Sequence, residues 1–138
     1  MSWLETKVIK LNINSQVDVV TARQKGREMA CKLGFSTADQ TRLATAISEL
    51  TRNVIQYAGN GTCVISDESN HQMIKVQVTV EDHGPGIPNI DKALEYGYTT
   101  GNGLGAGLPG ARKLVSHFMI ESSPGYTCVV ISISMKRT

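Results

Sequence analysis

The order of hydrophobic patterns along the chain is the feature that most restricts its fold. Residues 7–13 alternate, with Ile9, Leu11 and Ile13 on one side, and this predicts a half-buried strand. Two helical patterns follow, and after them come two pairs of short strands, each joined by a polar or Pro-Gly turn. Antiparallel hairpins combined with amphipathic helices predict an α+β fold of two layers rather than a parallel sheet.

Local signals predict where these elements begin and end. Asp18 is expected to cap a helix that ends at Gly34, and Ser36 opens a capping box before a second helix through about Tyr57. Strands are expected at 62–66 and 73–81, then an irregular glycine-rich span over 82–105, a helix to about His117, and strands at 118–122 and 127–135.

Length and charge restrict the class of protein. The chain has 138 residues, and we expect one domain covering residues 1–138. Its 14 basic and 12 acidic residues are interspersed and give a net charge of +2, so nucleic acid is not an expected partner. The longest apolar run, near residues 128–133, is far too short to cross a bilayer, and the N-terminus lacks an apolar signal region. We therefore expect a cytoplasmic protein without a membrane partner.

The three cysteines do not predict a disulfide framework or a zinc site. Cys31, Cys63 and Cys128 form no C-x-x-C pair and leave one thiol over. We expect them to be buried free thiols.

The segment from Gly101 to Leu114, GNGLGAGLPGARKL, is typical of a loop that leads into a helix. It lacks the lysine of a P-loop, G-x-x-x-x-G-K-[ST]. Residues 105–110 match G-x-G-x-x-G, but no buried strand precedes them as a dinucleotide fingerprint requires. Glycines allow close backbone approach, and a helix that opens near Ala106 points free N–H groups at an anion. This segment can therefore hold a polyphosphate without lysine.

The second predicted helix carries a candidate catalytic pair. Leu43, Ile47, Leu50 and Val54 form its apolar stripe, and Glu49 and Asn53 lie together on one flank of it. A carboxamide oxygen suits magnesium, and a carboxylate suits a general base or an orienting group. The helix alone favours the other reading, a solvated face that carries an incidental Glu and Asn.

The stretch EDHGPGIP, residues 81–88, supplies a third candidate. An apolar strand runs directly into Asp82, and Gly84 and Gly86 follow in a turn stiffened by two prolines. A carboxylate at a buried strand end can accept a hydrogen bond from an amino group such as that of adenine. Read alone, D-x-G-x-G is also a common turn, and His83 is expected to be a turn residue rather than a ligand.

The order E-x-x-x-N, D-x-G-x-G and G-x-G-x-G before a helix resembles the N, G1 and G2 boxes of the gyrase, Hsp90, histidine kinase and MutL ATP-binding superfamily. The likeness covers nearly the whole chain. Within that superfamily the chain is similar to the small anti-sigma-factor kinases, and among them to the RsbT-type switch kinases of bacterial stress signalling. The resemblance implies the Bergerat fold, with a mixed and largely antiparallel sheet, and it implies ATP and Mg²⁺ as cofactors.

The resemblance also implies a role for each site residue. Glu49 is the expected base, Asn53 the magnesium ligand and Asp82 the adenine ligand, with Gly84 and Gly86 in the nucleotide turn. The phosphate-covering loop and the last adenine contact are implied at Thr100, Gly103, Gly105, Ala106, Gly107 and Thr127. Arg112 and Lys113 are candidates for an additional basic contact to phosphate.

The implied activity is transfer of the γ-phosphate of ATP to a serine or threonine of a STAS-domain antagonist or scaffold protein. RsbT-type proteins, once released, also activate a PP2C-type phosphatase, so that protein is a second implied partner. The alternative is an anti-sigma factor that binds and sequesters a sigma factor in an ATP-dependent way. Arg52, next to Asn53, resembles the switch kinases, since many anti-sigma factors have a small residue there.

Overall fold

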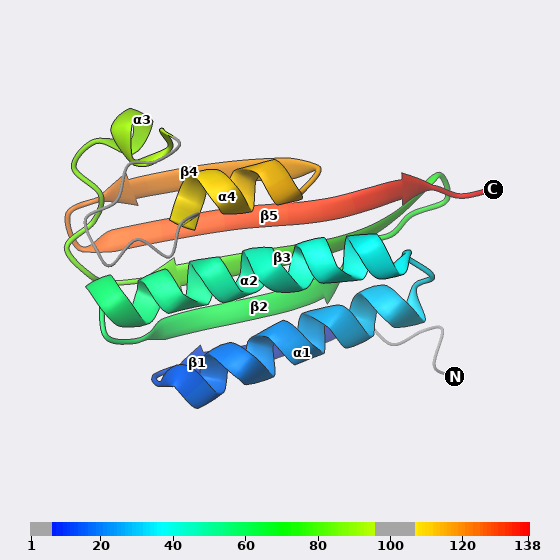
Figure 1. Cartoon of the computed structure of the whole chain (residues 1–138), viewed down its shortest axis with the longest axis horizontal. Helices are drawn as coiled ribbons and strands as arrows, with labels where there is room; N and C mark the ends of the chain where they lie inside the picture. Colours follow the sequence, from blue (N-terminus) through cyan, green and yellow to red (C-terminus); the bar gives the residue numbers. More distant parts are fainter. Residues whose placement is uncertain (1–6, 96–106) are drawn as a thin grey trace.

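The computed structural model, which describes residues 7–95 and 107–138, consists of one sheet with helices packed on one of its faces (Figure 1). Its elements are β1 (Val8–Ile13), α1 (Gln16–Lys32), α2 (Thr37–Tyr57), β2 (Gly61–Asp67), β3 (Met73–Asp82), α3 (Ile90–Ala93), α4 (Gly107–Leu114), β4 (His117–Ser123) and β5 (Tyr126–Lys136). The expected strand and helix types and the α+β class are confirmed. The short helix α3 lies inside the span that was expected to be irregular.

The sheet has the strand order β1-β2-β3-β5-β4, and all of these neighbouring strands pair antiparallel. The expected mixed sheet is therefore antiparallel throughout the described strands. The long central pair places Asp82 at the end of β3 directly opposite Thr127 of β5. This register brings two predicted site residues, far apart in sequence, to one end of the sheet.

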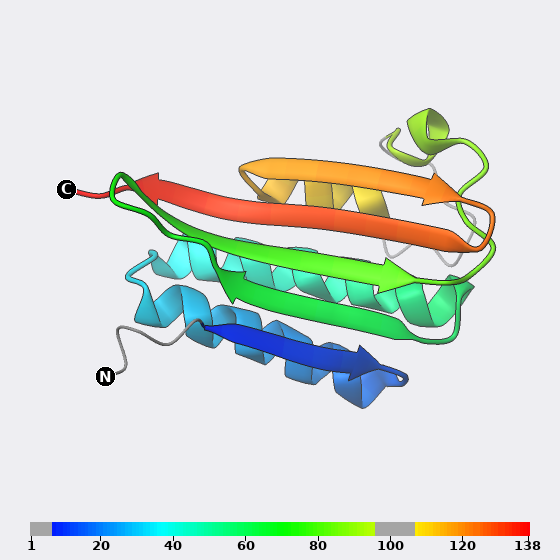
Figure 2. The ribbon, with the colours of Figure 1, turned by 180° about the vertical axis from the view of Figure 1, so that it is seen from behind.

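The core lies between the sheet and helices α1, α2 and α4. Figure 2 shows the opposite face of the sheet, which none of these helices covers. Alternation of side chains explains this arrangement, because Val76, Val78 and Val80 of β3 are buried on the helix side while the residues between them are half-buried. The most deeply buried apolar side chains include Ile13, Leu43, Ile47, Leu50, Ile65 and Ile131.

Two expected helix boundaries are wrong for local reasons. Ser15, not Asp18, is the N-cap of α1, and the Oδ2 atom of Asp18 accepts hydrogen bonds from the backbone N–H groups of Asn14 (2.8 Å) and Ser15 (3.1 Å). Asp18 therefore acts from inside the first turn, as the third residue of a capping box. The helix expected to reach His117 ends at Leu114, because the N–H of Ser116 already donates to the carbonyl oxygen of Ser132 in β5 (2.9 Å).

The limits of α2 agree with the sequence. The Oγ atom of Ser36 accepts a hydrogen bond from the N–H of Asp39 (3.1 Å), as the capping box predicts. The helix ends at Tyr57, and Gly59, with φ +87°, donates its N–H to the carbonyl oxygen of Val54 (2.9 Å). These two ends fix which part of α2 reaches the end of the sheet at Asp82.

The cysteines do not share one environment. Cys63 is completely buried, Cys128 is half-buried and Cys31 is exposed on α1, so the expectation of three buried thiols is correct only for Cys63. Burial raises the pKa of the Cys63 thiol to about 12.

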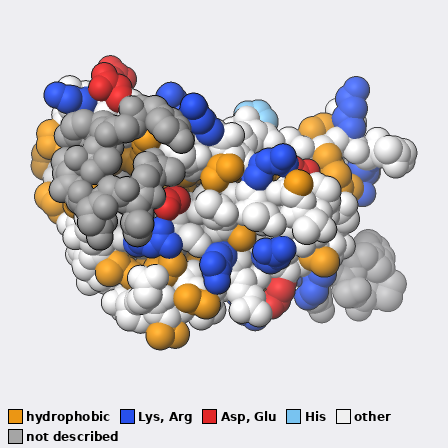
Figure 3. Space-filling model, in the orientation of Figure 1, with side chains coloured by type: hydrophobic (Ala, Val, Ile, Leu, Met, Phe, Trp, Pro, Cys, Tyr) orange, Lys and Arg blue, Asp and Glu red, His pale blue; other side chains and the backbone are white. Residues whose placement is uncertain are grey.

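No helix within the described ranges is both long and apolar enough to cross a membrane. Basic side chains occupy several separate places on the helix-covered face (Figure 3).

Candidate functional site

The C-terminal half of α2 places Glu49 and Asn53 beside the core, as the helical periodicity predicts. Ile47, Leu50 and Val54 are at most 3% exposed and face the sheet. Glu49 and Asn53 are half-buried, one turn apart, on the neighbouring flank of the helix. The two side chains therefore lie at the border between the core and the surface.

The Glu49 carboxylate is held by both of its oxygens. Its Oε1 atom accepts a hydrogen bond from Nη1 of Arg52 (2.9 Å), and its Oε2 atom accepts one from the backbone N–H of Gly107 (3.1 Å). Gly107 is the first residue of α4, where the N–H groups of a helix are free and the helix dipole favours a negative charge. Glu49 thus connects α2 with the start of α4 across a separation of 58 residues in sequence.

The carboxamide of Asn53 has no hydrogen-bond partner among the described residues. The side chain is half-buried. A half-buried carboxamide without an internal partner retains both a neutral oxygen ligand and two N–H donors. The position fits the role of a metal or ligand contact better than a role in packing.

Asp82 lies where β3 leaves the sheet. One of its oxygens, Oδ1, accepts the N–H of Gly84 (2.9 Å), which closes a tight turn. Within the described part of the chain, the second oxygen has no hydrogen-bond partner, so it can accept one from a ligand. A Cβ on Gly84 would lie 2.6 Å from the Cβ of Ala58, which shows that this turn packs directly against the end of α2.

Gly86 joins the same turn to the β4–β5 hairpin. Its φ of +84° favours glycine, and a Cβ there would overlap the backbone carbonyl of Ser123. The family resemblance implies that Gly84 and Gly86 belong to the nucleotide turn. In the structure both glycines permit close contacts within the protein, and these contacts hold Asp82 at the end of the sheet.

Thr127 belongs to a small hydrogen-bonded cluster beside Asp82. Its Oγ1 atom lies 2.6 Å from Oγ of Ser122, and that Oγ accepts the N–H of Ile87 (2.8 Å). Thr127 is 7% exposed, so its hydroxyl group is sheltered and already partnered. The cluster links both strands of the last hairpin to the turn that follows Asp82.

The predicted phosphate-covering loop lies mostly outside the described residues. This applies to Thr100, Gly103, Gly105 and Ala106. Gly107 is described, with φ +49°, and no other described part of the protein comes within 4 Å of the place a Cβ would occupy, its own helix and chain neighbours aside. Arg112 and Lys113 are exposed in the last turn of α4, at the opposite end of that helix from Gly107.

Sequence reasoning missed several contacts that build this end of the molecule. Arg52 was read only as a family marker, although its spacing of three residues from Glu49 is a standard ion-pair spacing on a helix. Ser122 was not singled out, and only strand register reveals that it faces Thr127. Two contacts of Tyr126 were also missed. Its hydroxyl group donates to Oε2 of Glu81 (2.6 Å), and this hydrogen bond raises the pKa of Tyr126. The centre of its ring lies 5.7 Å from that of the exposed His83 ring.

The residues present fit a nucleotide and its metal ion. Among the described residues, one carboxylate oxygen of Asp82 and the carboxamide of Asn53 have no hydrogen-bond partner, and α4 begins beside Glu49, one turn from Asn53 on α2. Residues 7–95 and 107–138 contain no cluster of three or more His, Cys, Asp or Glu side chains able to hold a metal. This donor set suits Mg²⁺, which proteins usually bind through few side chains together with substrate phosphates.

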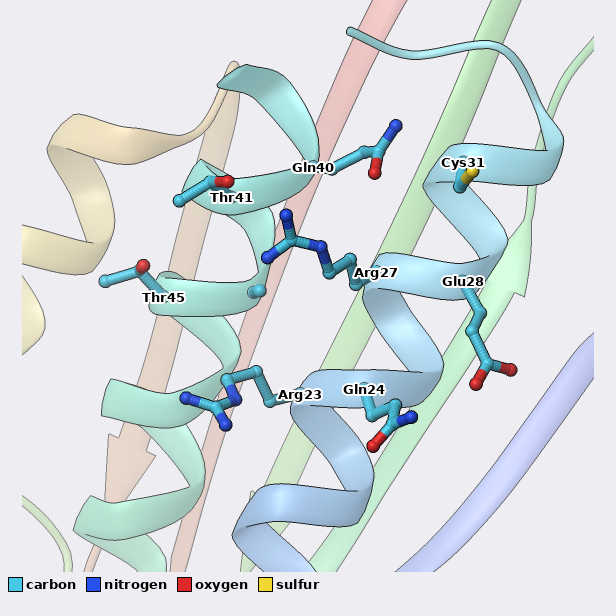
Figure 4. Close-up of a pocket in the computed structure, with 9 residues that line it drawn as sticks. Arg23, Gln24, Arg27, Glu28, Cys31, Gln40, Thr41 and Thr45 are labelled. Carbon is cyan, nitrogen blue, oxygen red and sulfur yellow. The ribbon is translucent and has the colours of Figure 1, made fainter. Parts of the chain in front are cut away.

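A second hollow on the surface is separate from this site. A groove of about 560 Å³ lies between α1 and the N-terminal half of α2. Figure 4 shows Arg23 and Arg27 extending from α1 toward α2 along this groove. None of the predicted site residues lines it, so the groove is not part of the candidate site.

Comparison with known proteins agrees with this geometry. The family model described as "Histidine kinase-, DNA gyrase B-, and HSP90-like ATPase" matches residues 38–137. The serine/threonine-protein kinase RsbT of Bacillus subtilis (strain 168) is 46% identical over 115 residues, which is 83% of this chain and 86% of RsbT. The adaptive-response sensory kinase SasA of Parasynechococcus marenigrum (strain WH8102) is 30% identical over 64% of this chain but only 26% of SasA.

Solved structures share the fold at low sequence identity. The RsbU and RsbW domains of Rv1364c from Mycobacterium tuberculosis superpose with a TM-score of 0.66 at 19% identity, over 97% of this chain and 33% of that one. The catalytic domain of histidine kinase ThkA superposes with a TM-score of 0.55 at 22% identity, over 94% and 95% of the two chains. The chain therefore has the Bergerat fold and belongs to the histidine kinase-, DNA gyrase B- and HSP90-like ATPase family, as an ATP-dependent member of the RsbT serine/threonine-kinase type.

Proposed function

We propose that the chain phosphorylates a serine or threonine of a STAS-domain antagonist or scaffold protein in a bacterial partner-switching pathway in the cytoplasm. When released from that protein, it activates a PP2C-type phosphatase. The observation that carries the proposal is the hydrogen bond between Glu49 and the first residue of α4, one turn from Asn53, in a chain 46% identical to a serine/threonine kinase. The turn of Asp82 packs against the C-terminal end of the same helix as Glu49, α2.

The described residues suggest how ATP would be held. Asp82 would accept a hydrogen bond from the adenine amino group through the oxygen that has no partner among the described residues, with Thr127 directly opposite it in the sheet. Asn53 would coordinate Mg²⁺ together with phosphate oxygens. Gly107 would lie at the phosphate end of the site, and Thr100, Gly103, Gly105 and Ala106 keep their expected role in covering the phosphates.

Glu49 is the proposed catalytic base. Bound ATP supplies the phosphoryl group, which passes to the acceptor hydroxyl as ADP leaves, and Glu49 takes the proton that the hydroxyl loses. Each carboxylate oxygen has two acceptor positions, so its contacts with Arg52 and Gly107 leave room for that proton. The side chain of Glu49 is only 13% exposed, which keeps most water away from its carboxylate.

Glu49→Gln tests this assignment. The variant keeps the shape of the side chain but loses its charge and basicity, so phosphotransfer from labelled ATP to a purified STAS-domain acceptor should fall by about 10²–10⁴. Calorimetry should show almost normal binding of Mg²⁺–ATP. A variant that transfers phosphate at the wild-type rate would remove Glu49 from the chemistry, and one that no longer binds ATP would make it a structural or metal-site residue.

A pull-down from native lysate separates the proposal from its alternative. The wild-type chain with Mg²⁺–ATP is used as bait, and mass spectrometry identifies the proteins it retains. STAS-domain proteins would support the switch kinase, whereas a sigma factor without STAS proteins would support an anti-sigma factor.

A further inference from the structure

The ion pair between Arg52 and Glu49 is sheltered, unlike a similar pair on the same helix. Arg42 and Asp39 also lie three residues apart on α2, and their N–O distance is 2.8 Å, but their side chains are 51% and 40% exposed. In the Arg52–Glu49 pair, at 2.9 Å, the exposed fractions are 35% and 13%. Exposed pairs of this kind contribute little to stability, whereas a carboxylate largely removed from water depends more strongly on its partner.

The two contacts of Glu49 together restrict its orientation. Arg52 holds Oε1 from the same helix, and the N–H of Gly107 holds Oε2 from the first residue of α4. A carboxylate held at one oxygen can rotate about its side-chain bonds, but one held at both has a single position between the two helices. Without Arg52, one of these restraints is lost and Glu49 retains only the backbone contact.

We propose that Arg52 is a positioning residue that keeps the Glu49 carboxylate oriented between α2 and Gly107. The inference rests on the proposed function, because it assigns Arg52 to the residue proposed as the base. The proposed action is through Glu49, which Nη1 of Arg52 contacts at 2.9 Å. The guanidinium group keeps other N–H donors, so direct contact with the nucleotide or the acceptor is the competing account. Lysine at this position would keep the charge but not the planar, forked geometry of the guanidinium group.

The kinetic test compares Arg52→Met with Arg52→Lys in the full chain. Misplacing a catalytic group by about 1 Å can cost about 100-fold in rate, so we expect Arg52→Met to lower kcat by about tenfold or more. Arg52→Lys should recover part of that loss, while the Kd for Mg²⁺–ATP stays within about twofold in both. Arg42→Met is the matched control, because it removes the exposed pair from the same helix, and its kcat should equal that of the wild type.

A double variant distinguishes positioning from direct contact with substrate. If Arg52 acts through Glu49, adding Arg52→Met to Glu49→Gln should cause no further fall in kcat, since the base is already absent. A second loss of about the same factor in the double variant, or a clear loss of ATP affinity in Arg52→Met alone, would overturn the proposal and indicate direct contact with phosphate or acceptor.

A spectroscopic test does not depend on kinase activity. In ¹⁵N-labelled protein, the Gly107 amide signal reports its hydrogen bond to Glu49. Arg52→Met and Glu49→Gln should both shift this signal, and Arg42→Met should leave it unchanged. If the wild-type chain phosphorylates nothing, the proposed function fails while these shifts still support the positioning of Glu49. An unchanged Gly107 signal in Arg52→Met would overturn the positioning whatever the activity.

Discussion

Two flanks of the same helix, α2, use their side chains in opposite ways. On the flank that faces the sheet, Leu43, Ile47 and Leu50 are at most 2% exposed and are surrounded by apolar side chains. On the neighbouring flank, Glu49 and Asn53 are half-buried, and Asn53 has no internal hydrogen bond in the described part of the chain. The first flank stabilises the fold, whereas the second keeps polar groups available for a ligand.

The largest expected effect on stability is on the sheet-facing flank. Ile47→Ala deletes a fully buried side chain from the centre of the core, and such changes cost about 2–5 kcal/mol of unfolding free energy. Urea denaturation followed by circular dichroism measures this loss. The comparison between the flanks would fail if Ile47→Ala unfolded no more readily than Thr45→Ala, an exposed control on the same helix.

A loss of the same order is expected from Gly86→Ala, at the turn that holds Asp82 in place. Gly86 and Gly125 both have positive φ, +84° and +91°, but only at Gly86 would a Cβ overlap another backbone group. Gly125→Ala should therefore cost only the conformational strain, about 1–2 kcal/mol, and Gly86→Ala about 1–3 kcal/mol more. Thermal denaturation of the two variants compares them directly, and equal losses would show that the contact with Ser123 is unimportant.

The smallest effect concerns the thiols, which report on core and surface without a change in sequence. At pH 8, Cys31 should react rapidly with a disulfide reagent because it is exposed. Cys63 should react only through unfolding, since burial hides it and raises its pKa to about 12, so almost none of it is thiolate at pH 8. Peptide mass spectrometry follows each site. Ile47→Ala should accelerate labelling of Cys63, and equally fast labelling of both thiols in the native chain would contradict the described core.

Sequence patterns predict the sheet-facing flank better than the flank of Glu49 and Asn53. The stripe of Leu43, Ile47 and Leu50 follows from helical periodicity, which is a local property. The contact between Glu49 and Gly107 joins residues 58 positions apart, and the pairing of Asp82 with Thr127 depends on strand register. The order of the three motifs, and the family resemblance that it carries, predicts a site at Glu49, Asn53 and Asp82, but not what holds each side chain in place.

Local sequence also misjudged some boundaries where two signals competed. Asp18 and Ser15 are both good caps, and the choice between them depends on which backbone N–H groups the Asp18 carboxylate reaches. Cys31 and Cys63 are the same residue type, yet one is exposed on α1 and the other lies in the core. Such differences arise from packing between elements, which a single sequence does not display.

The most direct test of the central claim is the affinity of Asp82→Asn for ATP, measured together with its stability. The claim is that the end of the sheet at Asp82 is built to bind a ligand, so the carboxylate's missing partner is ATP and not the core. Calorimetry should show ATP affinity lowered by about 100-fold or more, which is about 2.7 kcal/mol, while the free energy of unfolding changes by less than about 1 kcal/mol. Unchanged ATP affinity, or loss of the folded state, would contradict the account.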